Sequence, residues 1–212
     1  FTIALTERNR DMLERVERPG VEVVSVRRRW GNDPLYPAQL YALCRRIRPD
    51  LIHTRNFSCI EGLAAGRLAG VRAVLHSEHG RDVDEAVSFK RRRVFLRSLL
   101  YRFADRVVTV SEELREALLA QVDVAPEKLQ CVPNGVDLGR FAVRGGREKV
   151  RREFGVAPGE VVIGSLGRHD PVKDYRSLIR GFASLVASRR NDPSLPRVRL
   201  VLCGEGPEHA AL

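Results

Sequence analysis

The feature that most constrains the fold is a nearly uninterrupted alternation of short apolar runs with segments of helical period. Eight runs rich in Val, Ile and Leu predict strands at residues 2–5, 21–26, 50–54, 73–76, 107–110, 129–132, 161–166 and 198–203. Apolar residues at helical spacing predict helices at residues 36–48, 59–68, 89–104, 112–121, 148–154 and 175–188. Such strands, alternating with helices, are typical of parallel sheets covered on both faces. The sequence therefore predicts an α/β fold with parallel sheets.

The segment 133–147, PNGVDLGRFAVRGGR, breaks this alternation. It combines a Pro-Asn-Gly turn with a Gly-Gly pair and has no apolar period, as is typical of a linker. The pattern then restarts with a helix and the strand at 161–166. We therefore expect two α/β domains, at residues 1–140 and 141–212. Because the chain begins inside a strand-like run and ends where a helix is starting, we expect a fragment in which both domains are incomplete.

The composition narrows the class of protein. Hydrophobic residues make up 43% of the chain and charged residues 30%, which is ordinary for a globular protein. No apolar run is long enough to predict a membrane-spanning helix. The four cysteines, Cys44, Cys59, Cys131 and Cys203, lack metal-ligand spacing and lie in apolar surroundings. We expect them to be reduced thiols in a cytosolic protein.

A net charge of +10 raises the alternative of a nucleic-acid-binding protein. Such a protein would interleave aromatic with basic residues or carry a known RNA- or DNA-binding module. Aromatic residues make up only 6% of the chain, and no such module is recognisable. We therefore expect no nucleic-acid partner.

The basic charge is concentrated between Phe89 and Arg106, where seven basic residues accompany one acidic residue. Apolar residues recur there at helical spacing, and three arginines lie away from them. The apolar residues are Phe89, Leu96, Leu100 and Phe103, with Phe95 and Leu99 beside them, and the arginines are Arg91, Arg92 and Arg102. Such a basic amphipathic helix either packs its apolar face on the sheet or rests on anionic lipid headgroups. The two roles are compatible if the arginines face outward.

Ligands of open parallel sheets bind beyond the carboxyl ends of the strands. After the strand at 161–166 the chain continues with Gly167 and Arg168, and Lys173 follows just before a helix. The glycine permits close approach of the backbone, and the two cations can converge on a diphosphate near the helix start. The alternative is a solvated loop with incidental charges.

The strand at 198–203 is followed by Gly204, Glu205, Gly206 and Pro207. As a dinucleotide-binding fingerprint this loop is incomplete, because the third glycine is absent. It still suits a loop whose backbone comes close to a nucleotide.

Polar residues also follow the strands of the first half. Arg55 and Asn56 follow the strand at 50–54, His79 and Gly80 follow that at 73–76, and Ser111 follows that at 107–110. His79 can hydrogen-bond a ligand hydroxyl or serve the structure alone, and Ser111 suits the N-cap of the next helix. Asp82 and Asp84 resemble a D-x-D metal pair, but no third ligand is evident. We therefore expect no metal site.

Taken in order, these segments resemble family 4 glycosyltransferases. The matching segments are His79-Gly80, Val110-Ser111-Glu112, Val132 to Asp137 with Phe141, Gly167-Arg168 with Lys173-Asp174, and Leu202 to Pro207. The stretches 53–56 and 78–82 resemble a bacterial branch tied to exopolysaccharide gene clusters. The resemblance implies a GT-B fold with two Rossmann-like domains, the first on the acceptor side and the second binding a nucleotide sugar.

The resemblance also implies roles for individual residues. Catalytic residues would be His79, Arg168 and Lys173, of which the two cations hold the donor diphosphate. The donor would further contact Gly167 and the loop 204–207, and the acceptor side would comprise Arg55, Asn56, His79, Gly80 and Ser111. Asn134, Gly135 and Asp137 would lie at the crossover between the domains. Family members retain the anomeric configuration and need neither metal nor cofactor, so fixed cations would meet the developing charge.

Two segments of the family pattern are missing from the sequence, namely the glycine-rich loop after the first strand and a downstream Glu-x7-Glu segment. We therefore expect the 212 residues alone to be inactive and the parent protein to be a retaining hexosyltransferase. It would be cytoplasmic or peripheral at the inner face of the membrane, where residues 89–106 meet a lipid-linked acceptor. The alternatives are a non-catalytic GT-B-like binding protein and other GT-B enzymes such as epimerases or phosphorylases.

Overall fold

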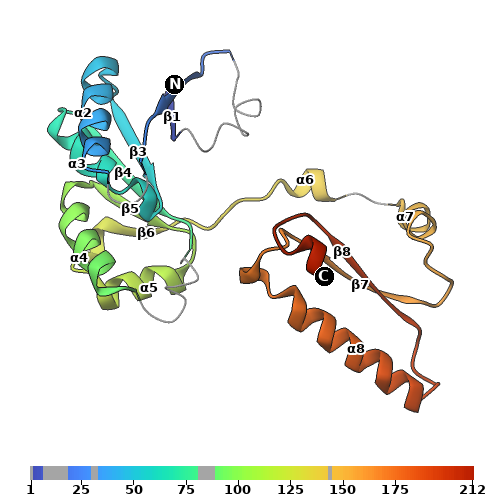
Figure 1. The fold of residues 1–212 in the computed structure, drawn as a ribbon. Coiled ribbons are helices and arrows are strands. Elements are labelled where there is room, and N and C mark those ends of the chain that lie inside the picture. Colours follow the sequence, from blue (N-terminus) through green and yellow to red (C-terminus); the bar gives the residue numbers. More distant parts are fainter. Residues whose placement is uncertain (1, 7–18, 30–32, 81–88, 143–144) are drawn as a thin grey trace. The chain divides into compact units, whose positions relative to one another are not determined.

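The computed structural model describes residues 2–6, 19–29, 33–80, 89–142 and 145–212 (Figure 1). The chain divides into two compact units, Phe1–Gly135 and Val136–Leu212. The boundary between the units lies inside the predicted linker. Strands alternate with helices in both units, and every strand pair is parallel. The predicted parallel α/β class is therefore confirmed.

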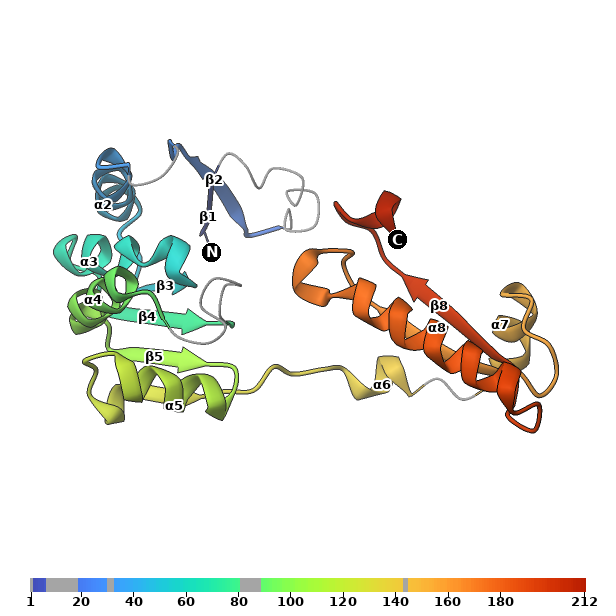
Figure 2. The ribbon, with the colours of Figure 1, turned by 60° about the horizontal axis from the view of Figure 1, so that its bottom comes forward.

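The first unit contains two sheets. Strand β1 (Thr2–Thr6) pairs with β2 (Glu22–Val26). The larger sheet has the order β3 (Leu51–Arg55), β4 (Ala73–Glu78), β5 (Arg106–Thr109) and β6 (Leu129–Cys131). In Figure 2, β4 and β5 run side by side in the same direction. The segments that follow β3, β4 and β5 therefore start from one edge of this sheet.

The helices of the first unit lie close to the predicted positions. They are α2 (Leu35–Ile47), η2 (Phe57–Cys59), α3 (Glu61–Leu68), α4 (Arg91–Leu100), η4 (Tyr101–Phe103), α5 (Glu112–Gln121) and η5 (Pro126–Lys128). The main core joins apolar side chains of α3, β4, η4, β5, α5 and β6, such as Leu63, Val74, Val107 and Leu118. This packing fixes the strand ends that carry the candidate site.

Helix α4 turns much of the predicted apolar face to the core, since Phe89 before it is buried and Leu100 packs against the core cluster. The three arginines predicted to face outward are exposed. The apolar pattern did not predict that Phe95 is 66% and Leu99 is 42% exposed, or that Arg97 is buried. Arg97 lies inside because it meets a buried carboxylate, that of Glu78.

The second unit is a single β-α-β crossover with short flanking helices. Its elements are α6 (Leu138–Phe141), α7 (Arg147–Glu153), β7 (Val161–Leu166), η6 (Pro171–Lys173), α8 (Tyr175–Asn191), β8 (Val198–Cys203) and η7 (His209–Ala211). Helix α6 occupies part of the segment predicted as an irregular linker, and it starts where Asp137 caps the backbone N–H of Arg140. Of the described residues of this unit, His169 and Tyr175 alone are buried.

No helix within the described ranges is both long enough and apolar enough to cross a bilayer.

Candidate functional site

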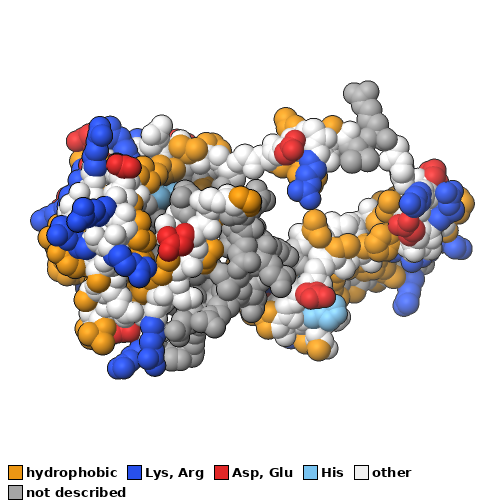
Figure 3. All heavy atoms as spheres, turned by 90° about the horizontal axis from the view of Figure 1, so that it is seen from above, with side chains coloured by type: hydrophobic (Ala, Val, Ile, Leu, Met, Phe, Trp, Pro, Cys, Tyr) orange, Lys and Arg blue, Asp and Glu red, His pale blue; other side chains and the backbone are white. Residues whose placement is uncertain are grey.

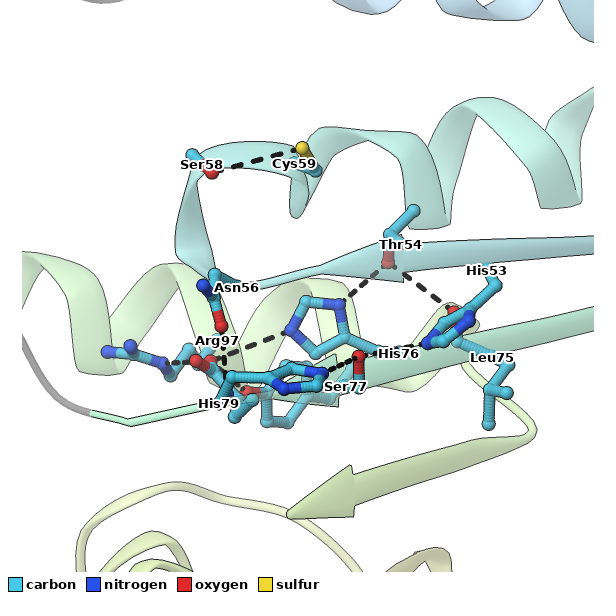
Figure 4. Close-up of polar contacts among 12 residues, drawn as sticks. His53, Thr54, Asn56, Ser58, Cys59, Leu75, His76, Ser77, His79 and Arg97 are labelled. Atoms are coloured by element: carbon cyan, nitrogen blue, oxygen red, sulfur yellow. Dashed lines mark hydrogen bonds and ion pairs between the residues drawn. The ribbon is translucent and has the colours of Figure 1, made fainter. Parts of the chain in front are cut away.

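The first candidate site lies where β3 and β4 end. The register places Arg55 opposite Ser77, so Asn56 and His79 leave the sheet side by side. The backbone N–H of His79 donates to Asn56 Oδ1 at 2.8 Å, and the backbone N–H of Asn56 donates to Ser77 O at 2.7 Å (Figure 4). Asn56 has φ +57° and ψ 169°, which lies outside the left-handed helical region that Asn favours, so its hydrogen bonds hold a strained backbone here. The structure therefore brings the predicted residues Asn56 and His79 together.

Ser77 links two imidazoles at this edge. Its Oγ lies 2.9 Å from His53 Nε2 and 3.0 Å from His79 Nε2. Burial, followed by the charges of Arg55 and His53, lowers the pKa of His79. Partial burial of the imidazole, followed by the charges of His76 and Arg55, lowers the pKa of His53, although the residue as a whole is exposed. Both rings are therefore neutral at pH 7.

A buried charged cluster anchors the end of β4. Glu78 Oε1 accepts from Arg97 Nε at 2.8 Å and from the Tyr101 hydroxyl at 2.7 Å. Burial alone would raise the pKa of Glu78, but the hydrogen bonds and charges of His76 and Arg97 outweigh it and lower that pKa to about 2. The carboxylate is therefore ionised, and it ties the residue next to His79 to helix α4.

His76 completes this cluster from the same strand. Its Nδ1 lies 2.7 Å from Thr54 Oγ1, and its Nε2 lies 3.5 Å from Glu78 Oε1, within reach of an ion pair but long for a hydrogen bond. A carboxylate can only accept, so a hydrogen bond between these two side chains would be donated by His76 Nε2. Sequence reasoning missed this cluster. The available signal was an arginine, Arg97, inside an otherwise apolar helical face.

For two other residues predicted on the acceptor side, Ser111 and Gly80, the structure shows local roles in the backbone. Ser111 caps α5 by accepting from the backbone N–H of Leu114 at 3.2 Å, as its position predicted. Gly80 has φ +142°, and an added Cβ would meet open space, so its backbone conformation is what favours glycine. Arg81, Asp82 and Asp84 lie outside the described residues. Across the ranges that the structure describes, no group of three or more His, Cys, Asp or Glu is placed to hold a metal ion.

The second candidate site lies where β7 and β8 end. The backbone N–H of Gly167 donates to Cys203 O at 2.9 Å, and that of His169 donates to Glu205 O at 2.8 Å. A Cβ on Gly204 would lie 1.9 Å from Gly167 O, and one on Gly206 would lie 2.2 Å from His169 O. Gly204 and Gly206 are therefore required where the loop after β8 packs against the loop after β7. This contact joins the two predicted donor-binding segments.

The predicted diphosphate-binding cations lie on the surface of the first of these loops. Arg168 is 71% exposed and lies 3.4 Å from Asp170, and Lys173 is exposed at the end of η6. Asp174 has φ +47° and caps α8 by accepting from the N–H of Ser177, which lowers the pKa of Asp174. Both cations are thus available to a ligand, and Asp174 fixes where α8 begins. Glu205 and Pro207 are exposed on the second loop.

His169 is a residue of this loop that the sequence did not single out. It is buried, with its Nδ1 2.9 Å from His209 Nδ1 and its ring edge against Tyr175 at 4.8 Å between centroids. His169 therefore holds the loop onto α8 and η7 from inside. No spacing in the sequence distinguishes it from its exposed neighbour Arg168.

Asn134 and Gly135 end the first unit and Asp137 begins the second, all three exposed. Asp137 has a local role as the cap of α6. Their predicted role at the crossover between domains remains a prediction.

Comparison with known proteins gives a consistent family. The family model described as Glycosyltransferase Family 4 matches residues 2–140. The chain is 34% identical over 112 residues to the UDP-Gal:alpha-D-GlcNAc-diphosphoundecaprenol alpha-1,3-galactosyltransferase of Escherichia coli, covering 49% of this chain and 27% of that protein. It is 30% identical over 148 residues to the putative glycosyltransferase EpsF of Bacillus subtilis, covering 68% and 36% respectively.

A solved structure shares the fold over nearly the whole chain. HepE of Anabaena, crystallised in complex with UDP, matches with a TM-score of 0.71 at 22% sequence identity, covering 97% of this chain and 53% of HepE. The chain therefore spans about half of that protein and less of the two relatives above. This likeness confirms the predicted GT-B class of fold. The chain belongs to glycosyltransferase family 4.

Proposed function

We propose that this chain is part of an enzyme that transfers a sugar from a nucleoside-diphosphate sugar to an acceptor. The observation that carries the proposal is the family 4 match over residues 2–140. The donor class is supported by HepE, which has been crystallised in complex with UDP, with UDP and glucose, and with UDP-glucose. It is also supported by the name of the E. coli relative, which specifies UDP-Gal.

In this proposal the second unit binds the donor. Arg168 and Lys173 bind the diphosphate and stabilise the negative charge that develops on the leaving nucleotide. Arg168 then exchanges its ion pair with Asp170 for one with phosphate, which is inexpensive because the guanidinium is largely exposed. The loop 204–207 borders the nucleotide. Transfer occurs with retention of the anomeric configuration and without a metal, because fixed cations replace it.

The first unit binds the acceptor in this proposal. His79 hydrogen-bonds a hydroxyl of the sugar or acceptor, with Arg55, Asn56, Gly80 and Ser111 around it. The names of EpsF and of the E. coli relative support a role in bacterial exopolysaccharide or cell-surface glycan synthesis. The name of the E. coli relative also specifies a diphosphoundecaprenol acceptor, which supports a lipid-linked acceptor here.

Helix α4 suits delivery to such an acceptor at the inner face of the membrane. Its exposed side includes the apolar residues Phe95 and Leu99 and the cations Arg91 and Arg92. Lys and Arg side chains form separate patches on the face of the first unit seen in Figure 3. Apolar side chains flanked by cations are typical of surfaces that bind anionic lipid headgroups.

The test is to incubate the full-length protein with a panel of nucleoside-diphosphate sugars and lipid-linked acceptors, and to measure nucleotide release and glycosylated product. Product should form in the presence of EDTA. Loss of activity on chelation, with recovery on adding Mn²⁺, would overturn the metal-independent mechanism. Binding of nucleotide without turnover of any donor would instead favour the non-catalytic alternative.

A further inference from the structure

Ser77 is the centre of a hydrogen-bonded chain of three side chains, His53, Ser77 and His79. Its hydroxyl oxygen lies within 3.0 Å of the Nε2 atoms of both histidines (Figure 4). His53 lies in the middle of β3 and His79 follows β4, so the hydrogen-bonded chain spans two neighbouring strands. Ser77 itself is buried, which shields its hydroxyl from competing water.

The count of protons restricts how this chain can be arranged. A serine hydroxyl has one proton to donate, and each neutral imidazole carries one proton on either Nδ1 or Nε2. Within the described part of the chain, Ser77 Oγ has no hydrogen-bond partner besides the two Nε2 atoms. If the hydroxyl donates to one Nε2, that ring must carry its proton on Nδ1. The other ring must then donate its Nε2–H to Ser77.

We propose that Ser77 is a positioning residue that forces His53 and His79 into opposite tautomers, so that the tautomer of His53 sets whether the outer nitrogen of His79, Nδ1, is a donor or an acceptor toward substrate. This proposal rests on the proposed function only in that His79 faces the substrate. A hydrogen bond to a sugar hydroxyl is directional, and the outer nitrogen of His79 must be consistently either a donor or an acceptor. His53, at the exposed end of the chain, acts on the ligand only through Ser77.

The surroundings support a fixed arrangement. Both rings are neutral near pH 7, because burial and the charge of Arg55 lower the pKa of each. Asn56 holds the backbone N–H of His79, and Glu78 is anchored to Arg97 and Tyr101 on α4. The peptide group that precedes His79 and the residue before it are therefore held, and Ser77 Oγ holds the ring itself, which leaves the tautomer as the main remaining freedom of the ring.

The test is to record the ¹⁵N-¹H correlations of the histidine rings of the 212-residue chain above pH 7.5, without substrate. We expect His53 and His79 to show opposite tautomers. Ser77→Ala should abolish this opposition and return both rings to the mixture of free imidazole, and His53→Leu should do the same for His79. Among the described residues, the Ser58 hydroxyl has one hydrogen-bond partner, Cys59 Sγ at 3.8 Å, so Ser58→Ala should leave both tautomers unchanged.

Identical tautomers in the two wild-type rings, or no change in the Ser77→Ala spectrum of a variant whose remaining spectrum is native, would overturn the proposal. This readout does not depend on activity. If the full-length protein transferred no sugar but the rings held opposite tautomers, the proposed function would fail while the coupling through Ser77 stood. In an active enzyme, Ser77→Ala should lower kcat and reduce the preference for the intact sugar over its deoxy analogues.

Discussion

At the scale of single residues, the site is partly visible in the sequence. His79, Asn56 and the cations Arg168 and Lys173 stand out because they follow strands, and the ends of parallel strands are where ligands bind. The partners that hold these residues do not stand out. Glu78 and Arg97 are 19 positions apart, and only the three-dimensional packing of α4 on the sheet reveals that they meet.

The first prediction concerns Arg168 and Lys173 and the affinity for the nucleoside diphosphate. In the full-length protein, Arg168→Ala and Lys173→Ala should each weaken nucleoside-diphosphate binding by roughly 1.5–3 kcal/mol, because each removes a charge-assisted hydrogen bond to phosphate. Titration calorimetry measures the change. The matched control is Arg190→Ala, an exposed arginine in the last turn of α8, which should leave the affinity unchanged. Unchanged affinity in both variants would show that the diphosphate binds elsewhere.

Glu78 makes the second prediction, which concerns stability and pH. Its pKa is depressed from 4.5 to about 2, so it contributes stability above pH 4.5 that is lost as the pH falls toward 2. Glu78→Gln should destabilise the first unit by about 3–5 kcal/mol at pH 7, because it leaves Arg97 buried without its carboxylate. Urea unfolding at a series of pH values measures both effects.

The variant should also flatten the pH dependence of stability between 4.5 and 2. Glu153→Gln serves as the control, because Glu153 is exposed and its pair with Lys149 spans 4.0 Å. An equal slope in wild type and Glu78→Gln would mean that the buried ion pair is not what titrates.

At the scale of elements, the sequence predicted segments with a regular apolar pattern well. It predicted less well those that depend on a buried charge or on a helix cap. The strands 161–166 and 198–203 and the helix 112–121 have the predicted bounds, because continuous apolar runs mark the two strands and Ser111 caps the helix. Helix α4 was placed correctly, but the burial of Arg97 on it was not predicted, since a charge is buried only where a partner such as Glu78 meets it. Helix α6 was missed because a single turn depends on its cap, Asp137, rather than on a periodic face.

The outer face of α4 makes the third prediction. Liposomes that contain anionic lipid should co-sediment the folded full-length protein, and binding should weaken with added salt because the arginines act by screened charge. Arg91→Glu with Arg92→Glu should reduce binding strongly. Lys149→Glu with Arg152→Glu on α7 changes the net charge equally and should have a much smaller effect. Binding that ignores lipid charge and salt would leave α4 as an ordinary solvated helix.

At the scale of the whole molecule, the two units differ in how completely they are packed. The core clusters of buried apolar residues lie in the first unit, whereas the two-stranded sheet of the second unit leaves Val161 and Leu166 exposed. A two-stranded sheet is marginally stable by itself and depends on what packs against it, which in the described part of the second unit is chiefly α8. The alternation of apolar runs predicted both units alike, because it reports where elements are and not how much surface they bury together.

This difference makes the fourth prediction. In hydrogen exchange on the 212-residue chain, amides of β4 and β5 should be protected far more strongly than those of β7 and β8, because opening the second unit exposes little buried apolar surface. The comparison is internal, since both sets of amides belong to parallel strands in one sample. Equal protection would show that the second unit is stabilised by contacts beyond its own strands and helix.

The interlocked loops at the ends of β7 and β8 have a consequence for protein engineering. Gly204 and Gly206 fit only against the backbone at Gly167 and His169, so the shape of either loop presupposes the other. Residues 204–207 could be replaced by those of a relative in order to change the nucleotide preference. In such a chimaera the new loop should adopt the conformation that it has in the relative only if residues 167–169 are exchanged with it. Mutational libraries that vary one loop alone would be enriched in misfolded members rather than in new specificities.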